Sequence, residues 1–196
     1  MATTNGVPRR RSAFPRVRLL KSARATGGQL VSSSPPIEEP GPRQVETVSL
    51  TVNGGKHQLD VRTNETLVDT LRDRLELKGT KVGCDDGSCG TCTVLLEGQP
   101  VYACMVLSID CEEQSIDTIE GLGTEDGPHA LQVAFADGYA AQCGFCTPGA
   151  IMAAKALLDR TPDPTETDVR LGLSGVICRC GYRKIIEATL DAARRV

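Results

Sequence analysis

The sequence has no tryptophan, and aromatic residues make up only 3% of its 196 positions. Its two histidines, His57 and His129, stand at neither metal-ligand nor catalytic-triad spacing from a partner. No apolar run approaches the ~18 residues that a membrane span needs, and P-loop, HExxH and nucleophile-elbow motifs are absent. We therefore expect a soluble chain with no substrate-transforming group of its own, and we expect both histidines to be ordinary surface or capping residues.

The net charge of −3 is unevenly distributed. Residues 1–45 carry eight basic and two acidic side chains, whereas the remainder carries 14 basic and 23 acidic ones. An acidic folded part is poorly suited to the phosphate backbone, so we expect no nucleic-acid partner.

Residues 1–44 are rich in Arg, Ser, Pro and Gly and predict a flexible basic extension. Arg10 and Arg11 resemble part of a twin-arginine export signal, but no apolar segment follows them. The Arg-rich, acid-poor composition would also suit a transit peptide. We expect a cytoplasmic protein, with periplasmic export through an atypical signal as the alternative.

Nine cysteines fall into two sets with one thiol left over, and their odd number argues against a disulfide framework. Set one comprises Cys84, Cys89, Cys92 and Cys104. Set two comprises Cys143, Cys146, Cys178 and Cys180. The remaining thiol, Cys111, is expected to be a buried structural residue, because free cysteine packs as a small hydrophobe.

Set one follows the plant-type [2Fe–2S] spacing C-x4-C-x2-C with a distant fourth cysteine. Its loop reads GCDDGSCGTC, and Gly83, Gly87 and Gly90 allow close backbone approach and positive φ. Amide N–H groups can then point at the sulfurs. A four-cysteine zinc site is the alternative, but such sites more often use paired short knuckles. The spacing therefore predicts a [2Fe–2S] cluster.

Set two, a C-x2-C and a C-x-C separated by 31 residues, is less specific. A second cluster, a zinc site and a redox-active dithiol would all suit these donors. A thioredoxin-like dithiol would need a βαβ setting that this segment lacks. Spacing alone leaves the three interpretations open.

The first half predicts a small mixed sheet with one helix laid across it. VETVSLTV, NGG and KHQLDV predict a β-hairpin, and Asn64 is expected to cap a helix with Leu67, Leu71 and Leu75 on one face. TCTVLLEGQPVYACMVL predicts two strands around a turn, and SIDTIEGL predicts another strand.

The second half predicts four short helices with cysteines at helix ends. PHALQVAFADGY and PGAIMAAKALLDR each begin with a proline in the first turn. Thr165 and Asp168 predict a capping box for a helix through Leu173, and RKIIEATLDAARR predicts the last helix.

Three segments, KVGCDDGSCGTCTVLLEGQPVYAC, AAQCGFCTPGAIMAAKALL and LSGVICRCGYRKIIEA, carry a resemblance to a known family. In this order they resemble the iron–sulfur subunit of the molybdenum hydroxylases, the family of xanthine dehydrogenase, aldehyde oxidoreductase and carbon monoxide dehydrogenase. The resemblance implies an α+β fold: an N-terminal β-grasp plant-type ferredoxin domain at 45–124, followed by an all-α four-helix-bundle [2Fe–2S] domain at 125–196.

The resemblance also implies cofactors and partners. The eight cysteines of sets one and two would bind the metal of two [2Fe–2S] clusters. Gln142 corresponds to a glutamine that hydrogen-bonds the pterin of the molybdenum cofactor, and Cys146 or its peptide would also touch it; for Gln142 a solvated helix-end amide is the alternative. The molybdopterin cofactor is expected on a large partner subunit and FAD on a medium subunit.

The second cysteine pair of set two departs from the family pattern G-N-x-C-R-C-T-G-Y. Gly175 is followed by Val176 in place of asparagine, and Cys180 passes directly to Gly181. The ligands are intact, but local contacts around the second cluster and toward the cofactor are expected to differ.

The expected function is an electron relay from a molybdopterin centre through two clusters to FAD or another acceptor. A stand-alone ferredoxin-like carrier, a zinc-stabilised module at set two and a family member that runs reductively are the alternatives. A carrier would need neither the helical domain nor Gln142.

Overall fold

The structure, a computed structural model, describes residues 44–124 and 127–195, which belong to one compact unit, Pro40–Val196. The expectations for the basic extension and its export signal concern residues 1–43 and lie outside the described residues. Within the described ranges, no helix is both long and apolar enough to cross a membrane.

The predicted hairpin at the start of the sheet is present. Strands β1 (Val45–Val52) and β2 (Gly55–Arg62) pair antiparallel from Val52↔Gly55 outward. Asn53 and Gly54 form the turn with φ of 50° and 78°. A two-residue hairpin turn with positive φ at both central positions favours this Asn-Gly pair.

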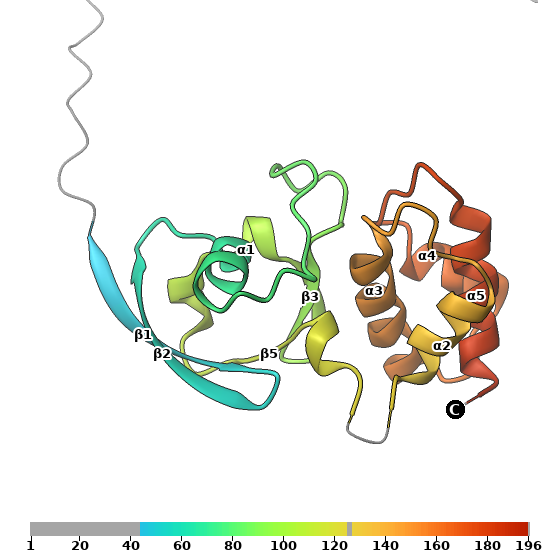
Figure 1. The fold of residues 1–196 in the computed structure, drawn as a ribbon, viewed down its shortest axis with the longest axis horizontal. Helices are drawn as coiled ribbons and strands as arrows, with labels where there is room; N and C mark the ends of the chain where they lie inside the picture. The colour runs from blue at the N-terminus through green and yellow to red at the C-terminus, as the bar shows by residue number, and fades with distance from the viewer. Residues whose placement is uncertain (1–43, 125–126, 196) are drawn as a thin grey trace, which may run out of the picture. The chain divides into compact units, whose positions relative to one another are not determined.

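A five-stranded mixed sheet is completed by β3 (Thr93–Leu96), β4 (Gln99–Tyr102) and β5 (Ser115–Asp117). The strand order is β2-β1-β5-β3-β4, with β5 parallel to β1 and antiparallel to β3 (Figure 1). Strands β3 and β4 form a short hairpin around a turn, as predicted from the sequence. One cysteine lies just before β3 and another just after β4. The sheet thus brings together residues on either side of this hairpin.

The helix across the sheet begins two residues later than predicted. Helix α1 (Leu67–Asp69) continues as a π-helical turn, Thr70–Arg74. Its N-cap is Thr66, whose hydroxyl accepts a hydrogen bond from the Asp69 N–H, so the prediction of Asn64 as cap was wrong. Thr63 and Asn64 instead lie in a turn closed by the hydrogen bond from the Glu65 N–H to the Arg62 carbonyl. The helix begins only after the Leu67 N–H has donated to the Val106 carbonyl and Thr66 has formed a bridge with Leu107.

Four helices follow, close to the predicted positions: α2 (Ala130–Asp137), α3 (Thr147–Arg160), α4 (Glu166–Gly172) and α5 (Tyr182–Ala193). Pro148 lies in the first turn of α3 and Thr165 forms the capping box of α4, as predicted. Helix α2 instead begins after His129, which is its N-cap, so Pro128 stands outside its first turn. This confirms the capping interpretation of His129.

Separate hydrophobic clusters lie in the two halves. The sheet and α1 bury one that includes Leu50, Leu67 and Ile116, and α2–α5 share another that includes Leu131 and Phe135. A small third cluster of Leu95, Met152 and Ala156 joins β3 to α3. The architecture is α+β, and few aromatic rings contribute to it.

Candidate metal centres

The β3–β4 hairpin joins two cysteines of set one. Cys92 immediately precedes β3, and Cys104 lies in a 3-10 turn (Ala103–Met105) directly after β4. Strand pairing of Thr93 with Tyr102 brings the two thiols to a Sγ–Sγ distance of 3.5 Å. Both side chains are buried.

The other two thiols of set one lie on the glycine-rich loop. Cys84 and Cys89 are half-buried, and their thiols are in hydrogen-bond contact. The Ser88 N–H donates to Cys84 Sγ at 3.3 Å. Gly87 and Gly90 adopt φ of 78° and 68°, which confirms the expectation that glycines let this loop turn its amides toward sulfur.

Set two is assembled from two loops at helix ends. Cys146 is the N-cap of α3, Cys143 lies just before it, and Cys178 and Cys180 precede α5. Cys180 Sγ lies 3.4 Å from Cys143 Sγ, and the thiols of Cys146 and Cys178 also contact each other. The Gly181 N–H donates to Cys178 Sγ at 3.4 Å.

One thiol pair in each set, Cys92–Cys104 and Cys143–Cys180, lies at a Sγ–Sγ distance of 3.5 and 3.4 Å, and this pairing fits [2Fe–2S] clusters. A [2Fe–2S] cluster takes four thiolates, two on each iron. Two thiolates on one tetrahedral metal, at the ~2.3 Å metal–sulfur distance of zinc thiolates, lie about 3.8 Å apart, close to the distances found here. In the described ranges no group of three or more His, Cys, Asp or Glu side chains surrounds a single metal position.

Burial controls the proton affinity of the most deeply buried thiol in each set. It raises the pKa of Cys92 and of Cys146 to about 12. Burial also acts to raise the pKa of Cys89, but hydrogen bonds from Thr91 and then Cys84 outweigh it and lower that pKa. For Cys143, the Phe145 N–H is the main cause of a lowered pKa. A bound metal would displace the protons of the inner thiols, because a coordinating thiol is deprotonated.

Each set has an inner pair and an outer pair. In set two the outer pair, Cys143 and Cys180, is exposed, whereas Cys146 is buried.

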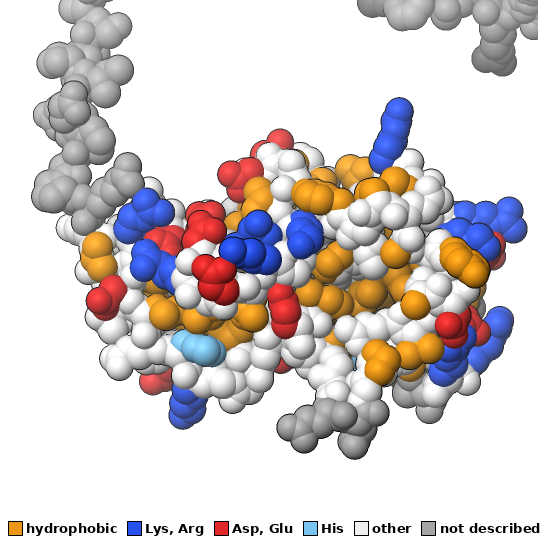
Figure 2. Space-filling model, viewed as in Figure 1, with side chains coloured by type: hydrophobic (Ala, Val, Ile, Leu, Met, Phe, Trp, Pro, Cys, Tyr) orange, Lys and Arg blue, Asp and Glu red, His pale blue; other side chains and the backbone are white. Residues whose placement is uncertain are grey.

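Four exposed apolar side chains lie on or beside the cysteine loops: Val82, Met105, Phe145 and Ile177. Figure 2 shows hydrophobic side chains at the surface of the upper edge, over the cysteine loops of Figure 1. We call these four residues the apolar rim.

Gln142 lies beside the exposed pair of set two. Its side chain is exposed, and its Nε2 lies so close to Gly181 that a Cβ there would be 3.1 Å away. This position is compatible with a partner's cofactor and equally with a solvated amide.

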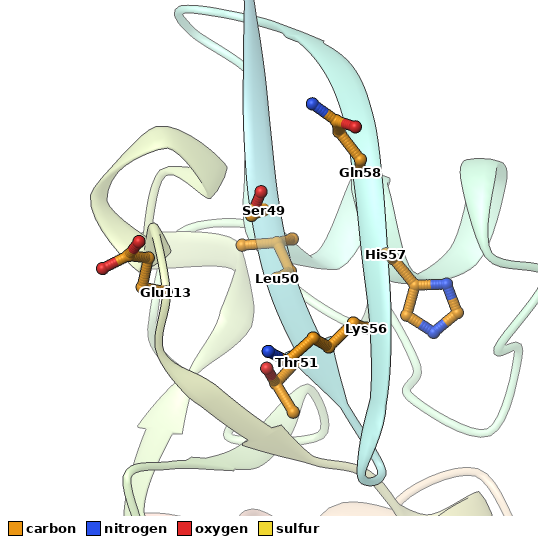
Figure 3. A pocket seen from close by; sticks show the side chains of 7 residues that line it. All are labelled: Ser49, Leu50, Thr51, Lys56, His57, Gln58 and Glu113. Atoms are coloured by element: carbon orange, nitrogen blue, oxygen red, sulfur yellow. The ribbon is translucent and has the colours of Figure 1, made fainter.

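The remaining candidate residues stand apart from both sets. Cys111 is fully buried, as predicted, and its pKa is raised to about 11 by burial. His57 lines a surface cavity of about 420 Å³ on β1 and β2 together with Ser49, Lys56 and Glu113 (Figure 3). No predicted cluster ligand lines this cavity.

Sequence reasoning missed the residues that connect the two sets. The Tyr102 hydroxyl donates to the Gly175 carbonyl at 2.8 Å, and the Ile177 N–H donates to the Cys89 carbonyl at 2.8 Å. No sequence motif marks an isolated tyrosine or a backbone amide as a contact between two loops. The glycines on both cysteine loops were the sole feature of the sequence that indicated a close approach of the two loop backbones.

Comparisons with known proteins agree with this geometry. A family model described as a 2Fe-2S iron-sulfur cluster binding domain matches residues 50–118, and one described as a [2Fe-2S] binding domain matches residues 118–190. The second match covers the segment that contains set two and shows a second [2Fe–2S] binding domain in the chain.

Curated relatives and a solved structure cover most of the chain. The nicotinate dehydrogenase small FeS subunit of Eubacterium barkeri is 43% identical over 150 residues, 76% of this chain and 96% of the relative. The aldehyde oxidoreductase iron-sulfur-binding subunit PaoA of Escherichia coli K12 is 39% identical over 201 residues, 91% of this chain and 87% of the relative.

A chain of the quinoline 2-oxidoreductase crystal structure from Pseudomonas putida 86 is 41% identical and superposes with a TM-score of 0.73. The match covers 78% of this chain and 98% of that chain. Two cysteine sets, two [2Fe–2S] family matches and relatives that are matched over 87% to 98% of their own length lead to one conclusion: the chain belongs to the iron–sulfur subunits of the molybdenum hydroxylases, oxidoreductases in which it binds two [2Fe–2S] clusters and serves electron transfer.

Proposed function

We propose that this chain relays electrons from the molybdopterin centre of a large partner subunit to FAD, on a medium subunit, or to another acceptor. The observation that supports it best is the backbone contact between the loops that carry the two thiol sets, the hydrogen bond from the Ile177 N–H to the Cys89 carbonyl. A module that held two unrelated metal sites would not need this contact.

We assign the ligands by the thiol pairs. Set one binds one cluster, with Cys84 and Cys89 on one iron and Cys92 and Cys104 on the other. Set two binds the second cluster through the pairs Cys143–Cys180 and Cys146–Cys178. The first cluster belongs to a β-grasp domain at 45–124 and the second to a four-helix-bundle domain at 125–196.

Each bound [2Fe–2S] cluster supplies one-electron redox chemistry. The chain contributes position, amide hydrogen bonds and burial. The N–H groups of Ser88 and Gly181 donate to ligand sulfurs, and such bonds raise a reduction potential because they stabilise the more negatively charged reduced state. Burial of Cys92 and Cys146 keeps water from the inner side of each set.

The large subunit is proposed to dock over the exposed pair of set two. Cys143 and Cys180 are exposed there, and Phe145 and Ile177 of the apolar rim are 47% and 60% exposed. Apolar side chains that remain exposed beside a redox centre are suited to a protein interface. Gln142, and Cys146 or its peptide, would then contact the molybdenum cofactor, with the Gln142 amide as the hydrogen-bonding group.

Metal content and assembly test the proposal together. We expect about four irons and four sulfides per chain, and co-purification of the native chain with a large molybdenum-containing subunit. Two irons with one zinc would contradict the cluster assignment. A lone chain that carries both clusters in size-exclusion chromatography would favour the stand-alone carrier.

The substrate is proposed to be selected on the large subunit. Relatives are named for N-heterocycles such as nicotinate and quinoline and for aldehydes, and the relay would serve either class. A cytoplasmic location stays a prediction. N-terminal sequencing of the native subunit tests it, because a start near about residue 40 would indicate export.

A further inference from the structure

A buried hydroxyl lies against one ligand sulfur of set one. The Thr91 side chain is 5% exposed, and its Oγ1 lies 3.2 Å from the Sγ of Cys89. The same hydroxyl lies 3.3 Å from the Lys81 carbonyl oxygen, to which it can also donate. The donors to the sulfurs of Cys84 and Cys178 are backbone N–H groups, whereas this donor belongs to a side chain. A substitution can therefore remove it.

A bound metal fixes the direction of this hydrogen bond. A cysteine that ligates a metal is a thiolate without a proton, so the Thr91 hydroxyl must be the donor. Its single proton then has two acceptors, the Cys89 sulfur and the Lys81 carbonyl. The sulfur carries the greater negative charge, and hydrogen bonds to charged acceptors are the stronger ones. The sulfur is therefore the preferred acceptor.

Gly83 and Phe145 border this contact. A Cβ built on Gly83 would lie 2.8 Å from both the Cys89 Sγ and the Thr91 Oγ1, so a side chain there would displace the sulfur or the hydroxyl. The same Cβ would lie 3.6 Å from the ring of Phe145, which comes from a loop of set two. Because Thr91 is buried, water competes little for its hydroxyl, and a hydrogen bond in such surroundings is electrostatically stronger than one in water.

On the basis of the proposed function, we propose that the Thr91 hydroxyl raises the reduction potential of the site that set one forms. Reduction adds one electron to the site and makes the ligand sulfurs more negative, while the hydroxyl keeps its proton and no bond is made or broken. The hydrogen bond to Cys89 strengthens with that charge, so it stabilises the reduced state more than the oxidised state. The large subunit is proposed to dock at set two, so a higher potential at set one draws electrons away from the molybdenum side.

The test compares Thr91→Val with Thr93→Val in the full chain loaded with both clusters. Valine keeps the branched shape of threonine and lacks its hydroxyl. Thr93 is the matched control, because it is 3% exposed and its hydroxyl donates to the Gly90 carbonyl at 2.7 Å. Both variants lose one buried hydrogen bond in the same segment, but only Thr91→Val loses a hydrogen bond to a ligand sulfur.

Three measurements are made on each protein. Iron and sulfide analysis shows whether both clusters are present. Urea denaturation gives the free energy of unfolding. A reductive titration with dithionite, followed by electron paramagnetic resonance, gives the midpoint potential of each cluster. The signal of set one is identified as the signal that Cys92→Ser lacks.

We expect Thr91→Val to weaken the electron affinity of the set-one site about three- to tenfold, which lowers its midpoint potential by about 30 to 60 mV. The midpoint potential of set two should stay unchanged. Thr93→Val should be destabilised like Thr91→Val but should keep both midpoint potentials of the wild type. An unchanged set-one midpoint potential in Thr91→Val, or an equal shift in Thr93→Val, would overturn the proposal.

Thr91→Ser retains the hydroxyl and separates its effect from that of the methyl group. We expect its set-one midpoint potential to stay near that of the wild type. A shift as large as the shift in Thr91→Val would contradict the role of the hydroxyl.

A second variant keeps the test decisive if Thr91→Val fails to hold the cluster of set one. Thr91→Ala also removes the hydroxyl, and the same outcomes apply to it. Loss of that cluster from both variants, with Thr91→Ser intact, would overturn the proposal, because the hydroxyl would then be needed to hold the iron. A wild-type chain without two clusters would contradict the proposed function, whereas two clusters with an insensitive midpoint potential would contradict this inference alone.

Discussion

The carboxylate of Glu65 is held by the guanidinium of Arg74 through two hydrogen bonds, one of them 2.7 Å between Nη2 and Oε2. The Thr70 hydroxyl adds a third at 2.9 Å, and Glu65 is only 3% exposed. The Glu65 backbone carbonyl also accepts from the Ser108 N–H, so this residue ties the start of α1 to the segment that follows Cys104.

The buried Glu65 carboxylate, held by the exposed Arg74, predicts an acid-sensitive fold. The Arg74 hydrogen bonds lower the pKa of Glu65 from 4.5 to about 2. A depressed pKa contributes stability above the unfolded value of 4.5, and that contribution, about 3 kcal/mol, is lost as the pH falls from 4.5 toward 2.

We therefore expect Glu65→Gln to destabilise the protein by about 3 kcal/mol at pH 7 and by progressively less below pH 4.5. Urea denaturation at a series of pH values, with circular dichroism as the signal, measures the difference from the wild type. Glu187→Gln, at an exposed ion pair, is the control and should leave stability unchanged. A difference that does not vary with pH would contradict the assignment.

The thiol pairs predict which cysteines bind iron. Replacing Cys92 or Cys146 by serine should lower the iron content from about four to about two per chain, because one cluster loses a ligand. Cys111→Ser should retain about four irons, since this buried thiol belongs to neither set. Iron and sulfide analysis of purified variants decides the matter, and loss of iron in Cys111→Ser would overturn the ligand set.

Two tyrosine hydroxyls predict opposite effects of the same substitution. Tyr102 donates a hydrogen bond to the Gly175 carbonyl, so Tyr102→Phe should destabilise by about 1 kcal/mol. The Tyr182 hydroxyl is buried and has no hydrogen-bond partner among the described residues, so Tyr182→Phe should be neutral or stabilising by about 1 kcal/mol. Thermal unfolding of the two variants side by side gives the comparison. An equal loss of thermal stability in the two variants would contradict this prediction.

The contact between α3 and the loop of set one predicts a strict requirement for Gly149. A Cβ there would lie 2.7 Å from the Gly90 carbonyl oxygen and 2.8 Å from that of Thr91. Overpacking against backbone typically costs about 1–3 kcal/mol, which exceeds the ~1 kcal/mol gained from the higher helix propensity of alanine. Gly149→Ala should therefore destabilise the protein and release iron faster on dilution into chelator.

Gly172→Ala is the matched control in α4. A Cβ at this position would have the Leu157 Cδ2, the flexible end of a side chain, as its nearest neighbour at 3.0 Å. We expect this variant to stay within about 1 kcal/mol of the wild type. Equal free energies of unfolding for the two glycine variants in urea denaturation would show that the loop of set one can move to accommodate the added methyl group.

Residue spacing was sufficient to predict the cluster type at set one and, with the motifs of set two, the family. It also predicted the Asn53–Gly54 hairpin and the Thr165 capping box, because such signals act over a few residues of chain. The same local reasoning misplaced the N-cap at Asn64. Asn64 lies in a turn, and the pairing of residues 66–67 with 106–107, which is long-range, moves the start of the helix to Leu67.

The sequence by itself predicted two sets of four cysteines: set one from its plant-type spacing, and set two from the family resemblance that its motifs carry. Only the tertiary structure decided which thiols pair and where the sets touch. Cys92 meets Cys104 because a hairpin closes between them, and Cys89 meets Ile177 because Gly90 leaves room for another backbone. These contacts depend on strand pairing and steric fit between segments about 12 to 90 residues apart, and no local pattern encodes such distances.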